Sequence, residues 1–429
     1  MIYILILLFI LIVAVVYLYI KNYIKGTHII GKLIISAGVL LFTLSIVIYP
    51  GESLSSALEG LTLWFNIVFP SLLPFFIGSE LLVALGLVSF LGTLLEPVMR
   101  PLFRVPGCGS FPFVMSITSG YPVGARIVAE IYNKKMCSKI EAQRLLSFCS
   151  TSGPLFMIGA VGIGMLNVRE SGMIIALSHY LGAITIGIIF RFYKYREDEM
   201  KIIRSGSLKE AIKNLLDSFK KEKRPLGLLL SNCVKNSINS ILMIGGFIIL
   251  FSVIIRIMSL TGIISILSRA LYIILFPLGI DSSLLKPITS SLFEITVGSK
   301  LIASSRAPLM QCIIAASGII AWSGLSIHAQ VAGMISTTDL KVSTYIVSKL
   351  LHSVLSCIYA YLLLSLINVK NLLSILEAFS YNNITAINNY SWFLRFTLSS
   401  EKFFYIIIGF MAAVIIFKAL SRLYSSLKN

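Results

Sequence analysis

The sequence predicts an all-α, polytopic membrane protein built from two inverted-topology repeats, each with broken or re-entrant helices. Composition is the first observation: 57% of the 429 residues are hydrophobic, the mean hydropathy is +0.92 and only 13% are charged. A soluble domain carries about 25% charged residues. The second observation is that polar, helix-breaking clusters recur at matching places in two apolar halves. Unwound backbone cannot face lipid, and paired breaks of this kind are typical of the binding site of a transporter.

The repeat shows in short segments. Residues 117–126 read Ile-Thr-Ser-Gly-Tyr-Pro and then Val-Gly-Ala-Arg, while 288–291 read Ile-Thr-Ser-Ser and 297–300 read Val-Gly-Ser-Lys. A second polar break follows in each half, at 150–153 and at 316–318. Small and polar residues are also common where transmembrane helices pack closely, so chance similarity is the alternative interpretation.

Apolar stretches and the residues that end them define the first half. Residues 2–20 and 29–48 predict two N-terminal transmembrane helices within 1–50. The first is predicted to be retained, because no charged segment precedes it and no small-residue cleavage site follows it. In the first repeat, 51–192, we expect a helix at 53–69, an apolar stretch long enough to span at 72–95, an interfacial connection at 100–109, broken elements at 110–130 and 142–167, and a span at 173–190.

A basic linker, residues 193–227, separates the repeats. An excess of Lys and Arg marks cytoplasmic loops, so we place this linker in the cytoplasm. Its 208–219 portion predicts an amphipathic surface helix. The formal net charge of +18 is explained by this topology, and no basic face with interleaved aromatic residues indicates nucleic-acid binding.

The second repeat, 228–368, follows the same plan. We expect a span at 239–257, an apolar segment at 263–278, broken elements at 284–304 and 308–334, and a closing span at 345–367. Residues 369–402 predict an interfacial or extracytoplasmic segment, and 403–429 a last transmembrane helix with a basic tail. If the linker and the tail are both inside, the repeats must run in opposite directions, as they do in many secondary transporters.

Small polar residues at the breaks are the predicted substrate-binding residues, because half-helix N-termini direct unpaired N–H groups and a positive dipole end into a cavity. They are Thr118, Ser119, Gly120, Tyr121, Ser150, Thr151, Ser152 and Gly153 in the first half, and Thr289, Ser290, Ser291, Ser317 and Gly318 in the second. The alternative for the whole set is close helix packing by small residues.

Five charged residues lie near these clusters. Arg126 and Lys300 each directly follow Val-Gly-small and are predicted partners of substrate carboxylates. Alternatively, both extend to the membrane interface from a helix end. Glu80, Glu130 and Glu294 lie in apolar context, where ionised groups are costly and usually functional. They are predicted either to pair with the basic residues or to carry a coupling proton or cation.

Neither catalysis nor a cofactor is expected. The six cysteines form no C-x-x-C pair and the four histidines form no H-E-x-x-H motif, so no metal site is predicted. Ser150 or Ser152 with His179 is a formal alternative for an intramembrane enzyme. His179 and His352, one in each closing span, are interpreted as helix–helix hydrogen-bond partners. No G-x-x-x-x-G-K-[ST] motif occurs, so any driving force is a gradient or trapping of the substrate on the far side.

Several of these segments resemble a known family. Residues 70–76 (PSLLPFF), 119–125 (SGYPVGA), 149–154 (CSTSGP) and 236–252 are similar to the YlbJ-type sporulation integral membrane proteins, and the likeness extends over roughly residues 50–370. That family belongs to the nucleoside-recognition or Gate domain group, so the resemblance implies a fold distantly similar to that of concentrative nucleoside transporters.

The resemblance also implies a function. It is passage of dipicolinic acid (pyridine-2,6-dicarboxylate) from the mother cell across the outer forespore membrane, in stage V of sporulation. The implied partners are this small anion and the lipid bilayer, with homo-oligomerisation left open. The alternatives are a transporter of nucleosides or another small solute, and a non-transporting structural or signalling protein of the spore envelope. Nothing in the spacing of the residues separates dipicolinate from another small carboxylate or a nucleoside.

Overall fold

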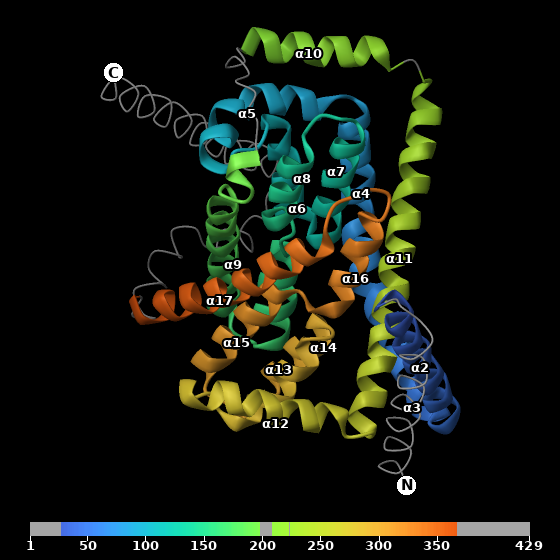
Figure 1. Cartoon of the computed structure of the whole chain (residues 1–429), viewed down its shortest axis with the longest axis vertical. Helices are drawn as coiled ribbons and strands as arrows, with labels where there is room; N and C mark the ends of the chain where they lie inside the picture. The colour runs from blue at the N-terminus through green and yellow to red at the C-terminus, as the bar shows by residue number, and fades with distance from the viewer. Residues whose placement is uncertain (1–26, 198–207, 223, 367–429) are drawn as a thin grey trace, which may run out of the picture.

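The computed structural model describes residues 27–197, 208–222 and 224–366, and every regular element in these ranges is a helix (Figure 1). The predicted helices at 2–20 and 403–420 and the segment 369–402 lie outside them. Four described helices are long and apolar enough to cross a membrane, namely Glu170–Phe190, Leu226–Leu260, Leu309–Met334 and Val342–Leu366. A fifth span arises if Ser36–Ile48 and Pro50–Asn66, which meet at an angle of 104°, are taken together. The predicted polytopic all-α class is confirmed.

The first half and the linker run from α2 to α10. The elements are α2 (Thr27–Ile48), α3 (Pro50–Leu63), the π-helix η1 (Trp64–Val68), α4 (Phe69–Ala84), α5 (Leu87–Phe103), the short η2 (Gly107–Gly109), α6 (Ser110–Ser119), α7 (Tyr121–Asn133), α8 (Lys139–Phe148), the π-helix η3 (Leu155–Met165), α9 (Arg169–Phe190), the short η4 (Tyr195–Glu197) and α10 (Leu208–Lys221).

The second half repeats that order. Its elements are α11 (Leu226–Leu260), α12 (Ile263–Leu275), the short η5 (Phe276–Leu278) and η6 (Ser282–Leu284), α13 (Leu285–Ser291), α14 (Ile295–Ala303), α15 (Leu309–Trp322), α16 (Gly324–Met334) and α17 (Val342–Leu366). In each half a long helical run leads into a shorter helix: α3, η1 and α4 run without a break into the turn before α5, and α11 precedes α12. Two broken elements and a closing helix follow in each half.

The two halves run in opposite directions. The long helix ends in each half at a glycine in the left-handed region, Gly86 with φ 79° and Gly262 with φ 80°, a conformation that costs glycine little. Each glycine opens the next helix, α5 or α12. These two helices lie at opposite ends of the molecule (Figure 1). The same element order therefore runs towards one end in the first half and towards the other end in the second, as an inverted repeat requires.

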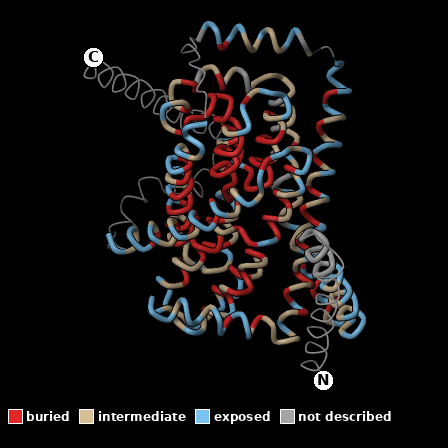
Figure 2. Tube along the Cα trace, in the orientation of Figure 1, coloured by how far each residue is buried: buried red, intermediate tan, exposed pale blue. Residues whose placement is uncertain are grey.

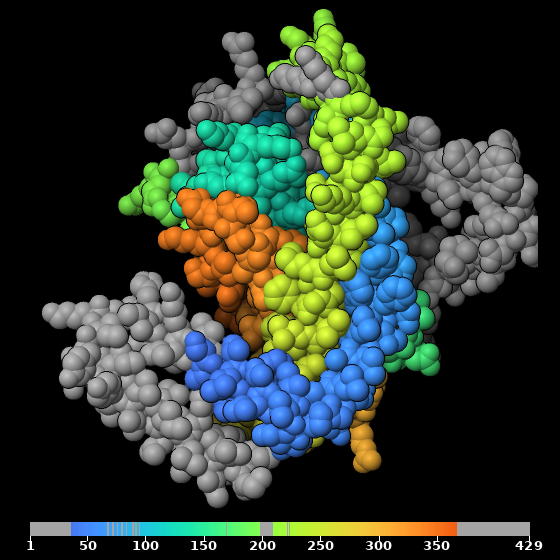
Figure 3. Space-filling view, turned by 90° about the vertical axis from the view of Figure 1, so that its right-hand side faces the viewer, coloured from blue at the N-terminus to red at the C-terminus, as the bar shows by residue number. Residues whose placement is uncertain are grey.

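The long helices of the two halves pack against each other. Figure 3 shows α11 lying along the surface between the blue α3–α4 segment and the orange α16–α17 region. The indole nitrogen of Trp64 donates to the Ile241 carbonyl at 3.1 Å, and a Cβ at Gly245 would lie 2.5 Å from the Trp64 ring. Glycine at this position lets the indole reach the α11 backbone.

One end of the first half is held by a buried ionic network. Arg100 on α5 pairs with Glu96 at 2.6 Å and with Glu141 on α8. The Glu141 carboxylate also accepts the Ser138 backbone N–H at 2.8 Å, which completes a capping box at the start of α8. This network fixes the entry of α8 into the protein, and α8 ends at the second helix break of this half.

Buried residues concentrate on α7, α8, α9 and α15, whereas a smaller share of α17 is buried (Figure 2). The amphipathic helix predicted at 208–219 is present as α10. The apolar stretch expected to be long enough to span at 72–95 is divided by a turn at Gly86, between α4 and α5. The turn is tight: a Cβ on Gly86 would lie 2.2 Å from Ser218 of α10.

Candidate functional site

The two helix breaks of the first half lie backbone to backbone. Helix α6 ends at Ser119 and α7 begins at Tyr121, with Gly120 between them at φ 94° and ψ −177°. Because side chains rarely tolerate that conformation, glycine is needed here. The second break is unwound from Cys149 to Gly153. A Cβ on Gly153 would lie 3.4 Å from the Thr118 carbonyl oxygen, so the two breaks are in contact.

The second half also joins its two breaks, through hydrogen bonds. Between α13 and α14, the carbonyl oxygens of Leu292 and Phe293 accept from the N–H groups of Leu325 at 2.8 Å and Ser326 at 2.9 Å, at the start of α16. The Trp322 indole also donates to the Leu292 carbonyl, at 3.2 Å. Both halves therefore bring unwound backbone together inside the protein, as predicted for residues 110–130, 142–167, 284–304 and 308–334.

The position of the last break differs from the prediction. Ser317 and Gly318 lie inside the continuous helix α15, and the chain breaks at Ser323 and Gly324, with φ of 79° and 76°. The Ser317 hydroxyl donates to the Ile313 carbonyl of its own helix at 2.9 Å. A Cβ on Gly318 would lie 2.4 Å from Cys357 Sγ, so this glycine allows α17 to approach. The prediction of a helix break at 316–318 is wrong, because these small residues allow α15 to pack closely against α17.

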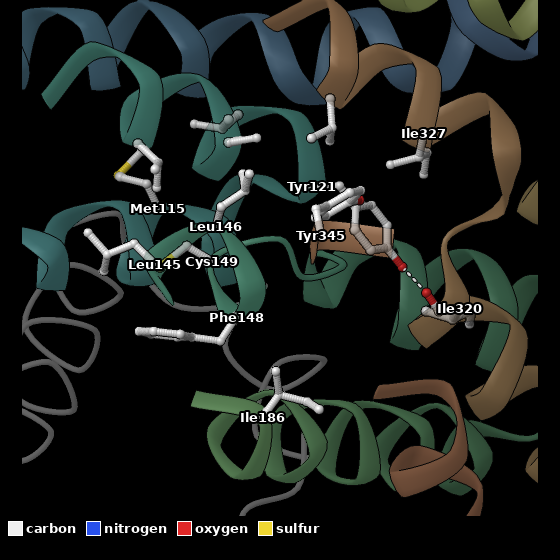
Figure 4. Close-up of a cluster of buried hydrophobic side chains, with 14 of the residues drawn as sticks. Met115, Tyr121, Leu145, Leu146, Phe148, Cys149, Ile186, Ile320, Ile327 and Tyr345 are labelled. Carbon is white, nitrogen blue, oxygen red and sulfur yellow. Dashed lines mark hydrogen bonds between the residues drawn. The ribbon is translucent and has the colours of Figure 1, made fainter. Parts of the chain in front are cut away.

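The two halves are connected across the breaks. The Tyr121 hydroxyl donates to the Ile320 carbonyl at the end of α15 (Figure 4). The Ser152 N–H donates to Nε2 of His179 on α9 at 2.9 Å, and the Tyr180 hydroxyl donates to the Ser152 carbonyl at 3.1 Å. Because Nε2 of His179 accepts a backbone N–H, this contact orients the break and does not activate a serine hydroxyl.

The predicted polar residues do not all share one environment. Those buried at or beside the first-half breaks are Ser119, Gly120, Tyr121, Ser150, Thr151 and Ser152, with Gly153 partly exposed. Thr118 is exposed and donates to the carbonyl of its own helix at Val114. Thr289, Ser290 and Ser291 are buried in the last turn of α13, directly before the first break of the second half.

The charged residues have individual partners. Arg126 on α7 forms an ion pair with Glu80 on α4, and it donates to Ser240 Oγ on α11 at 2.9 Å. Glu130 pairs with Lys134 at 2.7 Å. Glu294 is buried and caps α14, because its carboxylate accepts the Val297 N–H at 2.7 Å and the Thr296 hydroxyl at 3.0 Å.

Lys300, the repeat counterpart of Arg126, is exposed on α14. Each of the two basic residues is the sixth residue of the helix that follows the first break. The structure therefore preserves their place in the repeat but brings neither of them to the breaks of the other half.

Sequence reasoning missed a lysine at the centre of the protein. Lys349 on α17 is 0% exposed, and its Nζ donates to the Ser150 carbonyl at 2.8 Å. Nδ1 of His352 lies 3.3 Å from the same ammonium, and Nε2 of His352 lies 2.8 Å from the His179 carbonyl. The available signal was a Lys-x-x-His pair in an apolar span, because residues three apart share a helix face.

An aromatic and imidazole cluster adjoins this lysine. The ring of Tyr121 is centred 5.1 Å from Lys349 Nζ. The Tyr345 hydroxyl lies 3.3 Å from Ser150 Oγ, and the Tyr345 ring centroid lies 5.3 Å from that of His328. The His328 ring lies in turn 4.5 Å from Trp322. The cluster thus connects the second break of one half with the second break of the other.

Comparison with known proteins finds one matching family model and several similar proteins. The family described as Gate, nucleoside recognition, matches residues 65–169, which include both breaks of the first half. An uncharacterized protein of Alkalihalophilus pseudofirmus is 30% identical over 177 residues, covering 39% of this chain and 36% of that protein. A solved structure of a CNTnw double mutant in an outward-facing state shares 11% identity and a TM-score of 0.35, covering 77% of this chain and 86% of that one.

The most extensive of these similarities is to the sporulation integral membrane protein YlbJ of Bacillus subtilis strain 168. The two sequences are 41% identical over 342 residues, which cover 78% of this chain and 83% of that protein. The match spans both halves of an all-helical, membrane-crossing fold. This chain therefore belongs to the family of the sporulation integral membrane protein YlbJ.

Proposed function

We propose that this protein is a secondary transporter or facilitator that works by alternating access during sporulation. Its proposed substrate is dipicolinic acid, carried from the mother cell across the outer forespore membrane. The observation that carries the transport proposal is the pairing of helix breaks in two oppositely directed halves. Unwound backbone in a membrane protein must be buried or line a cavity, and paired breaks supply a substrate site about which two halves can rock.

The chemistry at the breaks suits a small, planar anion. Tyr121 begins α7, so the N–H groups of that half-helix and its positive dipole end lie at the break. Rings of Tyr121, Tyr345 and Trp322 supply flat apolar surface in the same region. The choice of dipicolinate and of the forespore membrane is supported by the family to which the chain belongs.

A second candidate is transport of nucleosides. It is favoured by the match of residues 65–169 to the nucleoside-recognition family. A nucleoside carries no carboxylate, so its binding would not require a cation at the breaks. The two candidates can therefore be separated by competition and by substitution of basic residues.

The test is uptake of labelled dipicolinate into proteoliposomes that contain the full chain, beside Arg126→Ala and Lys300→Ala. We expect saturable uptake that inosine and uridine do not compete. Loss of uptake in the two variants would assign Arg126 and Lys300 to carboxylate binding, as the repeat predicts. Nucleoside uptake without dipicolinate uptake under any ion gradient would reject the proposed substrate in favour of the second candidate.

A further inference from the structure

Lys349 has no ionic partner in the part of the chain that the structure describes. It is the eighth residue of α17, a helix long and apolar enough to cross a membrane, and its side chain is 0% exposed. Its two polar neighbours, the Ser150 carbonyl oxygen and Nδ1 of His352, are both neutral acceptors. Glu294, the buried acid at the first break of the second half, caps α14 with its carboxylate.

An arrangement of this kind is costly unless a negative charge joins it. A buried ammonium without a counter-charge is penalised by several kcal/mol, and ionisable residues inside membranes usually mark substrate or ion pathways. An ammonium offers three donors, of which two are directed at the neutral acceptors described above. An anionic occupant would supply the missing charge, and its oxygens would replace the neutral acceptors of the ammonium.

A second buried group nearby also lacks its partners. His328 on α16 is 4% exposed, and neither of its ring nitrogens has a hydrogen-bond partner. Buried polar atoms are normally satisfied, so an orphaned imidazole is a position where a ligand can complete the bonding. His328 belongs to the cluster that reaches Lys349 through Tyr345 and Ser150. A buried lysine without an ionic partner and a buried imidazole without hydrogen-bond partners, both of the second half, therefore belong to one cluster that reaches the second break of the first half.

We propose that Lys349 is the anchor for a carboxylate group of the transported anion. In this proposal, carboxylate oxygens of the substrate replace the Ser150 carbonyl oxygen and Nδ1 of His352 as acceptors of the Lys349 ammonium. The inference rests on the proposed function, because it identifies Lys349 as the positively charged residue of the proposed substrate site. It excludes Arg126, which is held by Glu80, from being the primary anchor.

The proposal also links binding to movement. The Lys349–Ser150 hydrogen bond joins α17 of the second half to the unwound segment of the first half. A substrate carboxylate that takes over the ammonium releases the Ser150 carbonyl, so the two halves lose one direct tie when the site fills. Differential contacts of this kind are what allow a ligand to shift a conformational equilibrium.

The test is calorimetric binding to the full chain in lipid nanodiscs. The probes are dipicolinate, benzene-1,3-dicarboxylate, the neutral dimethyl ester of dipicolinate, and inosine. The variants are Lys349→Met and Lys349→Gln, with Lys220→Met on α10 as the matched loss of an exposed lysine outside the site. We expect dicarboxylate affinity to fall by about 30-fold or more in both Lys349 variants. The Lys220→Met protein should bind as wild type, and the ester should bind weakly to all forms.

Folding is controlled within the same set. Met replaces a buried charge by an apolar chain of similar length, which is often neutral or stabilising, and Gln keeps a donor for the Ser150 carbonyl. Unchanged dipicolinate affinity in both Lys349 variants would overturn the inference while leaving the proposed substrate in place. Binding of another dicarboxylate, lost in both variants, with no binding of dipicolinate, would keep the inference and reject the substrate. Inosine binding alone, insensitive to Lys349, would reject both.

Discussion

The helix that follows the first break in each half depends on a glycine at its fourth position. These residues are Gly124 in α7 and Gly298 in α14, the glycines of the two Val-Gly-small motifs. A Cβ at Gly124 would lie 1.9 Å from the Cys149 carbonyl oxygen, and one at Gly298 would lie 2.6 Å from the Ser291 Cα. The repeated motif thus marks the points where each helix touches backbone beside a break.

Substitution by alanine should force these contacts apart. Real Cβ atoms essentially never approach other heavy atoms within 3.0 Å, so the Cys149 carbonyl would have to retreat by about 1 Å. Overpacking a filled interior costs about 1–3 kcal/mol. The close neighbours at both sites include backbone atoms, which cannot rotate away, and this favours the upper end of that range. Gly246 in α11 is the matched control, because nothing lies within 4 Å of its Cβ position. Alanine there should gain up to about 1 kcal/mol of helix propensity.

The assay is thermal unfolding of the purified protein in detergent, followed by tryptophan fluorescence and by the monodisperse fraction after heating. Gly124→Ala and Gly298→Ala should melt at lower temperature than wild type, and Gly246→Ala at an equal or higher temperature. A Gly124→Ala protein as stable as Gly246→Ala would refute the close approach at the break.

Three further predictions follow from individual contacts. Glu294→Ala should lower the free energy of unfolding by about 1 kcal/mol because α14 loses its N-cap, and Glu294→Asp should restore that stability. Lost uptake in a stable Glu294→Asp protein would instead indicate that Glu294 takes part in ion coupling. Replacing both Glu80 and Arg126 by Ala should lower the free energy of unfolding by less than the sum of the two single losses, because each single change leaves a partly buried charge without its partner. Losses that add to within about 0.5 kcal/mol in melting experiments would contradict the ion pair. Gln143→Ala should lower the free energy of unfolding by about 1–2 kcal/mol, because the Gln143 amide hydrogen-bonds both the N–H and the carbonyl of Lys341 in the other half. An unchanged melting temperature would argue against this connection between the halves.

Much of the fold can be predicted from the sequence, because helices that cross a membrane must be apolar over about 20 consecutive residues. Long apolar stretches gave the spans of α9, α11 and α17, and the Gly120 break follows from a Gly-x-Pro cluster in an apolar stretch. The last break could not be located in the same way. Ser-Gly occurs at both 317–318 and 323–324, and local propensity does not distinguish a glycine needed for a turn from one needed for helix packing.

The candidate site was predictable only in part, because charge burial depends on tertiary packing. Glu294, Glu80 and Arg126 stood out as charges in apolar context, yet their structural partners come from contacts that no spacing reveals. Lys349 belongs to a span that begins with other polar residues, and its complete burial arises only when α17 packs against α9 and α15. Its lack of an acidic partner among the described residues is a three-dimensional property.

The most direct test of alternating access is exchange. Proteoliposomes that hold the full chain are preloaded with unlabelled dipicolinate, and the initial rate of labelled dipicolinate entry is compared with that of empty vesicles. If substrate binding releases the Lys349–Ser150 hydrogen bond, the loaded carrier should reorient faster than the unloaded carrier. Labelled dipicolinate should then enter preloaded vesicles faster than vesicles without internal dipicolinate. If preloaded vesicles show saturable uptake but take up labelled dipicolinate no faster than vesicles without internal dipicolinate, substrate binding does not release the hydrogen bond between the two halves, and the proposed link between binding and movement is contradicted.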